Sequence, residues 1–215
     1  AEIARACTVS GRSRADVTLV AVSKGHPAAS LQTMYDLGVR HFGESRLQEA
    51  LPKIAALPND VRWHFVGTLQ TNKARRIADQ FHLIHTVAKE EHLREMGKSG
   101  RKVAALVEVN IGSEPQKVGV PPEQLNEFLE NVLQYGCVQI HGLMGIGRAG
   151  LSDEEKREEF RLLSNLASRF SLPLLSMGMS DDYAAAIQEG ATHIRVGTAL
   201  FGGRPPGPSP VVDRG

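Results

Sequence analysis

The sequence predicts an α/β protein that folds as a single closed (β/α)₈ barrel. Strand-like and helix-like segments alternate from one end of the chain to the other, which is typical of a parallel sheet covered by helices. The alternation gives eight strand-then-helix units, the number that closes such a sheet into a barrel. The connections between units are short, and a chain of 215 residues suits one barrel of this kind.

The first half of the chain begins with a short expected helix over residues 1–10. The apolar, β-branched run Thr18–Ser23 predicts the first strand. Pro27 opens the next helix, because proline is favoured in the first turn of a helix. Short apolar runs and longer mixed segments then continue to alternate. The expected strands are Arg40–Gly43, Arg62–Gly67 and Leu83–Val87, and the expected helices are Pro27–Leu37, Ser45–Ala56, Gln70–Ala78 and Lys89–Gly97.

The second half repeats the pattern and ends in a proline-rich tail. The expected strands are Val103–Val109, Val138–Met144, Leu174–Met177 and His193–Val196, and the expected helices are Pro122–Leu133, Asp153–Arg169, Asp181–Glu189 and Ala199–Gly202. An open, doubly wound sheet is the structural rival, but no Gly-x-Gly-x-x-Gly pattern follows the first strand. Residues 1–204 are expected to form one domain, and residues 205–215 are expected to be disordered.

The composition is that of an ordinary globular protein, with 41% apolar and 23% charged residues. Lys and Arg number 25 against 24 Asp and Glu. Nucleic acids and anionic membranes are therefore not expected partners. Cys7 and Cys137 do not form a disulfide framework, which favours a reducing cytoplasm as the location. No apolar run approaches the roughly 18 residues that a membrane span needs.

Lys24 is the first candidate site residue, because active sites of such barrels lie at the carboxyl ends of the strands. The period-two alternation of a strand places Val20, Val22 and Lys24 on one face. A lysine at the end of an inward apolar row is costly to bury unless it is used. A buried amine tends to be neutral, the form that makes Schiff bases. The alternative is a lysine that extends to solvent at the rim, and strand position alone leaves both open.

The loop after the seventh expected strand carries Ser180 and Asp181, either of which can cap the following helix. That capping role alone would explain the serine. However, phosphate groups in this fold often bind to the loops after strands seven and eight. A serine hydroxyl beside free helix N–H groups forms an anion site. Ser180 is therefore a candidate phosphate ligand.

The last expected strand points to the same kind of ligand. Ile194 and Val196 share one face of this strand and should face the helices, which directs Arg195 into the barrel. A buried arginine needs an acceptor or an anion. Gly197 lets a ligand approach the backbone, and Thr198 adds a donor.

The histidines carry less functional signal. His64 is interpreted as a hydrogen-bonded core histidine and not as a catalytic one. His82 and His85 are three residues apart, but no carboxylate or thiol cluster accompanies them. No metal site is therefore expected, and no residue is assigned a catalytic role.

An ordered set of short segments spans nearly the whole chain, from residue 19 to residue 202. The segments are Leu19–Lys24, His41–Glu44, Trp63–Lys73, Val109–Asn110, Lys117–Gly119, Gly142–Met144, Ser176–Ser180 and Arg195–Gly202. Together they resemble the pyridoxal phosphate homeostasis proteins, which are small single-barrel relatives of the alanine racemase N-terminal domain.

The resemblance implies a barrel of fold type III among proteins that bind pyridoxal 5′-phosphate (PLP), without a second β-domain. It implies that Lys24 forms a Schiff base with PLP and that Arg195 contacts the pyridine nitrogen. Ser180, Gly197 and Thr198 would bind the phosphate. One position departs from the family, which usually has Asn where this chain has Ser45. That difference puts an asparagine-specific contact near the cofactor in doubt.

The implied role of Arg195 bears on function. A guanidinium donates to the ring nitrogen and leaves it unprotonated, so the ring is a weaker electron sink. The related racemases also take a second base from an extra domain and a dimer partner. We therefore expect a monomeric, non-catalytic PLP-binding protein in vitamin B6 and amino-acid homeostasis, with PLP-dependent apoenzymes or a regulatory protein as partners. A weak amino-acid racemase or other PLP enzyme, a phosphosugar enzyme without pyridoxal and a protein-binding scaffold stay open as alternatives.

Overall fold

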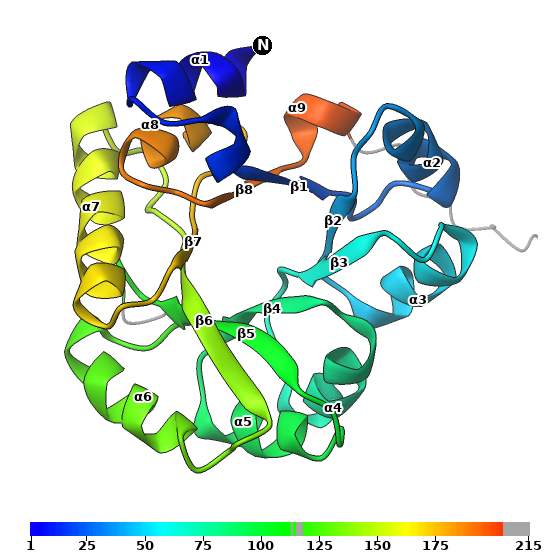
Figure 1. The fold of residues 1–215 in the computed structure, drawn as a ribbon, viewed down its shortest axis with the longest axis vertical. Coiled ribbons are helices and arrows are strands. Elements are labelled where there is room, and N and C mark those ends of the chain that lie inside the picture. The colour runs from blue at the N-terminus through cyan, green and yellow to red at the C-terminus, as the bar shows by residue number, and fades with distance from the viewer. Residues whose placement is uncertain (113, 115–117, 204–215) are drawn as a thin grey trace, which may run out of the picture.

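The computed structural model describes residues 1–112, 114 and 118–203. In this part of the chain, eight parallel strands close into one barrel in sequence order (Figure 1). The predicted (β/α)₈ barrel is confirmed. The proline-rich tail and Lys117 lie outside the described residues. The strands are β1 (Thr18–Val22), β2 (His41–Glu44), β3 (Arg62–Phe65), β4 (Leu83–Val87), β5 (Val103–Val109), β6 (Val138–Gly145), β7 (Leu174–Ser176) and β8 (His193–Val196).

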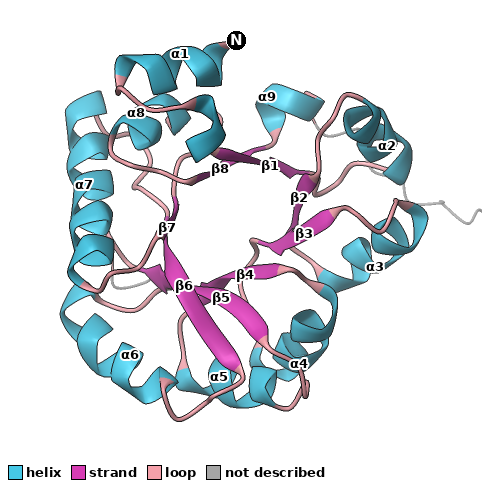
Figure 2. Cartoon of the chain, viewed as in Figure 1, coloured by secondary structure: helices cyan, strands magenta, loops and turns pink. Residues whose placement is uncertain are grey.

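Helices surround the barrel, as Figure 2 shows in cyan around the magenta strands. Helix α1 precedes β1 and packs beside α8, where Tyr183 Oη donates to Glu2 Oε2 over 2.7 Å. None of the described helices is both long and apolar enough to cross a membrane. The helices are α1 (Glu2–Val9), α2 (Ala28–Asp36), α3 (Leu47–Ala56), α4 (Thr71–Gln80), α5 (Glu90–Gly97), α6 (Leu125–Val132), α7 (Asp153–Arg169), α8 (Tyr183–Gln188) and α9 (Thr198–Phe201).

Most helices begin or end one or two residues from the predicted bounds, and two of the differences change how a helix begins. The segment expected as one helix from Pro122 divides into a 3₁₀ turn, Pro122–Gln124, and α6. The other difference is at α8, whose N-cap is Asp182. The expectation that Ser180 or Asp181 caps this helix is wrong, because two further residues of the loop form a turn before the helix begins.

The core has an outer and an inner part. Outward-facing side chains of the strands, such as Phe42, Ile194 and Val196, pack under the helices, as the alternation predicted. Inside the barrel, Leu83, Leu106 and Met144 form a small apolar cluster. Much of the remaining interior is polar, and buried polar groups need hydrogen-bond partners. These polar interior residues are His64, His85, Glu108, Ser176, His193 and Arg195.

Candidate functional site at the carboxyl-terminal end of the barrel

Lys24 lies in the turn directly after β1, and its side chain is exposed. Val20 and Val22 share one face of β1, as the alternation predicted. A Cβ atom added to Gly43 on the neighbouring strand β2 would lie 3.0 Å from the side chain of Val20 and 3.4 Å from that of Val22. However, β1 ends at Val22 and the turn carries Lys24 beyond the layer of interior side chains. Of the two alternatives that strand position left open, the structure shows the lysine that extends to solvent at the rim. The amine lies at the rim of the barrel, where a solvent-borne molecule can reach it.

A buried ion pair holds the turn that presents Lys24. Lys53 Nζ donates to Ser23 O over 2.9 Å and to Glu44 Oε1 over 2.6 Å. Ser23 Oγ donates to the same carboxylate over 2.6 Å. Glu49 accepts from Lys53 and from the backbone amide that follows Lys24. The residues on both sides of Lys24 are thus fixed, although its own side chain is free in solvent.

Arg195 lies inside the barrel on β8, which pairs with β1. The predicted inward direction is confirmed, because the residue is only 5% exposed. Its Nη1 donates to Ser176 Oγ over 2.7 Å and its Nη2 to Gly145 O over 3.0 Å. Burial lowers the pKa of Arg195 to about 10, so the guanidinium stays cationic at neutral pH. Two of its five N–H donors have protein acceptors among the described residues.

Glu108 is a second ionisable group in the barrel interior. It lies on β5 and is 8% exposed. Burial raises its pKa to about 7, against the opposing effect of the positive charge on Arg195. Sequence reasoning missed this residue. Glu108 lies two residues after Leu106 in the predicted strand, and residues two apart share one face of a strand. This spacing from an interior residue was the signal that could have found it.

Ser180, Gly197 and Thr198 follow β7 and β8, next to β1. A backbone hydrogen bond from β8 to Gly178 O, 2.9 Å long, joins the two strand ends. Gly197 lies against β1, since a Cβ there would be 3.1 Å from Val22 O. Within the described residues, the hydroxyls of Ser180 and Thr198 have no hydrogen-bond partner, so both can donate to an anion. The structure thus brings the predicted phosphate ligands to the same end of the barrel as Lys24.

A cavity of about 490 Å³ opens beside Lys24, between the beginnings of α3 and α4. Arg46 and Lys73 also line it, and no carboxylate does. Ser45, the position that departs from the family pattern, is half-buried and lines the same cavity. Three positive charges around one cavity favour an anionic ligand next to Lys24.

The prediction for His64 is confirmed. It is 1% exposed and lies within hydrogen-bonding distance of His41 and His85. In the part of the chain that the structure describes, no group of three or more histidine, cysteine or acidic residues is arranged to hold a metal ion.

Comparison with known proteins gives close relatives over nearly the whole chain. The pyridoxal phosphate homeostasis protein of Aquifex aeolicus is 39% identical, over 94% of this chain and 93% of that protein. The protein of the same name from Pseudomonas aeruginosa is 41% identical, over 95% of this chain and 92% of that protein.

Solved structures agree. PipY of Synechococcus elongatus PCC7942 without PLP has a TM-score of 0.83 at 40% identity, over 93% of this chain and 100% of that one. The structure of PipY with PLP bound has a TM-score of 0.78 at 38% identity, over 94% and 100%. Alanine racemase from Bartonella henselae shares the fold, with a TM-score of 0.71 at 16% identity over 95% of this chain and 63% of that one.

The family description "Alanine racemase, N-terminal domain" matches residues 5–205. This match covers the barrel, and the two curated relatives cover 94% and 95% of the chain. The chain therefore belongs to the alanine racemase N-terminal domain family and, within it, to the pyridoxal phosphate homeostasis proteins.

Proposed function

We propose that this protein binds PLP at the carboxyl-terminal end of its barrel and acts in vitamin B6 and amino-acid homeostasis. The observation that carries the proposal is the placement of Lys24 directly after β1 and of Arg195 on the neighbouring strand β8. An amine can form a Schiff base with the aldehyde of PLP, and a buried guanidinium can donate to its ring nitrogen. The PLP-bound structure of the relative PipY supports this assignment.

The remaining groups of the site fit a phosphate. Ser180 and Thr198 present two hydroxyls without partners among the described residues, on loops that meet beside β1. Arg195 is buried in the barrel on β8, and Lys24 is exposed directly after β1. Hydrogen bonds from such donors to a phosphate are charge-assisted and stronger than neutral ones.

The chemistry of these residues favours holding the cofactor over rapid turnover. When bound, PLP supplies a reactive aldehyde and a ring that can accept electrons. Lys24 fixes the aldehyde, and Arg195 donates to the ring nitrogen and keeps it unprotonated, which weakens the ring as an electron sink. Because Lys24 is exposed, a competing amine can reach it. We infer a monomeric cytoplasmic carrier that exchanges PLP with apoenzymes or is read by a regulatory protein.

The proposal is tested by visible absorption of the purified protein after addition of PLP and removal of the excess. We expect an absorption band of the lysine adduct for the wild type and for Lys73→Ala. Lys73 is the matched control, because it is a second lysine that lines the cavity beside Lys24. Lys24→Ala should fold normally and lack the band. An unchanged band in Lys24→Ala would refute the site.

One observation favours a second candidate, a weak amino-acid racemase. The pKa of Glu108, raised by burial to about 7, suits a group that both accepts and donates protons near neutral pH. Chiral chromatography of L-alanine incubated with the PLP-loaded protein separates the two functions. The carrier predicts no D-alanine above the level of Lys24→Ala. Racemisation that is lost in Glu108→Gln would support the second candidate.

A further inference from the structure

Three imidazoles and one hydroxyl form a continuous chain of hydrogen bonds that ends on Arg195. His41 Nδ1 lies 2.9 Å from His64 Nε2, and His64 Nδ1 lies 2.8 Å from His85 Nε2. His85 Nδ1 lies 2.8 Å from Ser176 Oγ, which accepts the 2.7 Å bond from Arg195. The side chains between the two ends are completely or almost completely buried.

The register of the parallel strands produces this arrangement. His41 pairs with Arg62, and His64 on the same strand as Arg62 lies two residues further along. His64 in turn pairs with Leu83, and His85 lies two residues beyond it. From β2 to β3 to β4, each histidine therefore lies two residues closer to the carboxyl-terminal end of the barrel than the one before.

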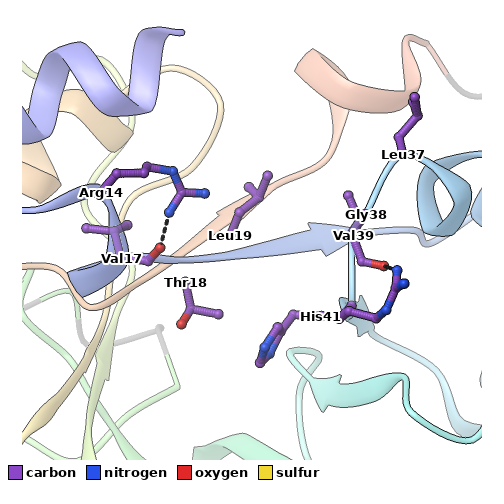
Figure 3. A pocket seen from close by; sticks show the side chains of 9 residues that line it. Arg14, Val17, Thr18, Leu19, Leu37, Gly38, Val39 and His41 are labelled. Carbon is purple, nitrogen blue, oxygen red and sulfur yellow. Dashed lines mark hydrogen bonds between the residues drawn. The ribbon is translucent and has the colours of Figure 1, made fainter.

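His41, the end of the hydrogen-bond chain that lies away from Arg195, is at the amino-terminal face of the barrel. His41 is half-buried and lines a pocket of about 420 Å³ together with Thr18, Leu37 and Arg40. Figure 3 shows Thr18 at the beginning of β1 and His41 at the beginning of β2. The chain thus connects this amino-terminal face with the guanidinium at the functional end.

The donors and acceptors have one consistent arrangement. A guanidinium only donates, so Ser176 Oγ accepts from Arg195 and keeps a hydroxyl proton of its own. Within the described residues, His85 Nδ1 is the acceptor for that proton. His85 then donates from Nε2 to His64, and His64 donates from Nε2 to His41. Burial lowers the pKa of both central imidazoles well below the usual value, so each is neutral and has the one proton and one lone pair that this requires.

We propose that His85 and His64 are positioning residues for Arg195, which act through Ser176 to fix the direction in which the guanidinium donates. That the guanidinium contacts the ring nitrogen of PLP rests on the proposed function. The positive charge aligns the dipoles of the chain, so each hydrogen bond strengthens the next. Without His85, the Ser176 hydroxyl is free to rotate, and among the described residues Arg195 keeps Gly145 O as its one fixed acceptor.

Other charged and titratable groups lie around the two central imidazoles. His82, which directly precedes β4, and His193 from β8 lie near His64, with ring centroids 6.2 and 5.9 Å away. His193 also lies 6.1 Å from His85. None of these ring contacts is a hydrogen bond. Among the described residues, the hydrogen bonds that connect the three histidines to Arg195 therefore pass through Ser176 alone.

The arrangement of the chain is tested in the protein without cofactor. Two-bond ¹H–¹⁵N NMR correlation of histidine-labelled protein reports which ring nitrogen carries the proton. We expect Nε2–H tautomers for His64 and His85, unchanged between about pH 8 and pH 6. His82, outside the chain, is the internal reference. A His85 that carries its proton on Nδ1 would contradict the arrangement.

The positioning role is tested on Arg195 itself, also without cofactor. In the wild type we expect separate ¹⁵N resonances for the two Nη atoms, because the guanidinium cannot rotate freely. In His85→Leu these resonances should merge. His85→Asn should restore them, since its Oδ1 can accept from Ser176. Ser176→Ala removes the same link at small cost in volume and serves as the second variant if His85→Leu fails to fold.

The consequence for PLP is measured separately. We expect His85→Leu to lose PLP to a competing apoenzyme about tenfold faster than the wild type, the equivalent of one lost hydrogen bond. The pH profile of its absorption band should shift, and His85→Asn should restore both. His92→Asn is the control, since His92 is a buried histidine of α5 outside the chain.

The outcomes separate the two proposals. Separate Nη resonances in folded His85→Leu and Ser176→Ala would overturn the positioning role and leave PLP binding intact. So would a pH profile and release rate like those of the wild type. If the wild type binds no PLP but the Nη resonances depend on His85, the proposed function fails and the positioning of Arg195 stands.

Discussion

At the scale of single residues, the proposed contact of Arg195 with the ring nitrogen would determine the electronic state that the site imposes on a bound ring. Arg195→Glu replaces a donor by a carboxylate, which favours a protonated ring nitrogen and a stronger electron sink. We expect PLP-loaded Arg195→Glu to form pyridoxamine phosphate from L-alanine faster than the wild type. The buried, unpaired charge should also lower the free energy of unfolding by about 3 kcal/mol. Arg195→Lys, which keeps the charge, is the control, and equal rates in all three proteins would exclude this role.

We propose that Ser180 and Thr198 set the retention of the phosphate. Each charge-assisted hydrogen bond contributes about 1.5–3 kcal/mol, or roughly ten- to a hundredfold in affinity. We expect the double variant Ser180→Ala/Thr198→Ala to release PLP to a competing apoenzyme at least about tenfold faster. Thr68→Ala, a threonine that lines the cavity on the other side of Lys24, should release it at the wild-type rate. Equal release from the double variant and the wild type would mean that the phosphate lies elsewhere.

At the scale of elements, the ion pair between Lys53 of α3 and Glu44 of β2 joins a helix to the strand ends that carry the site. Glu44 is completely buried and Lys53 is 5% exposed. Lys53→Met leaves a buried carboxylate without its cation, and we expect the free energy of unfolding in urea to fall by about 3–5 kcal/mol. The double variant Glu44→Gln/Lys53→Met should recover most of this loss. A single variant as stable as the wild type would show that the pair does not hold the turn.

Most elements could be predicted because the apolar runs of a barrel strand are short and sharply bounded. Leu83–Val87, Val103–Val109 and His193–Val196 begin and end as predicted. Helix beginnings were less certain. The backbone amide of Met179 donates to Asp182, and this contact within the loop sets the point where α8 begins.

The site was predictable where one strand decides the direction of a side chain. Arg195 could be placed inside because Ile194 and Val196 alternate with it. Strand position alone left the burial of Lys24 undecided, because Glu44 and Lys53 from other elements set the turn after β1. The hydrogen-bond chain to Arg195 depends on the register among several strands, and a sequence without an alignment does not supply that register.

At the scale of the whole molecule, buried histidines couple stability to pH. Burial lowers the pKa of His193 to about 4 from about 6.5 in the unfolded chain. The unfolded state therefore binds more protons between these values, and the free energy of unfolding falls as the pH drops through this window. His193 alone should cost about 3 kcal/mol at pH 4. His64 and His85 act in the same direction.

Urea unfolding followed between about pH 8 and pH 4 measures this coupling. We expect a steady loss of stability below about pH 6.5 and a shallower slope for His193→Gln, which removes one titrating group. Burial of Glu108 acts in the opposite direction, so the comparison with the variant decides: a slope for His193→Gln equal to that of the wild type would mean that His193 takes up its proton as readily in the folded protein as in the unfolded chain.

The central claim is that Lys24 carries PLP, and the most direct measurement is borohydride reduction of the PLP-loaded protein followed by peptide mass mapping. Reduction makes the bond between amine and cofactor permanent, so the modified residue can be read from the fragment masses. The account predicts one stoichiometric pyridoxyl adduct, on Lys24. An adduct on Lys73 or another lysine, with Lys24 unmodified, would contradict it.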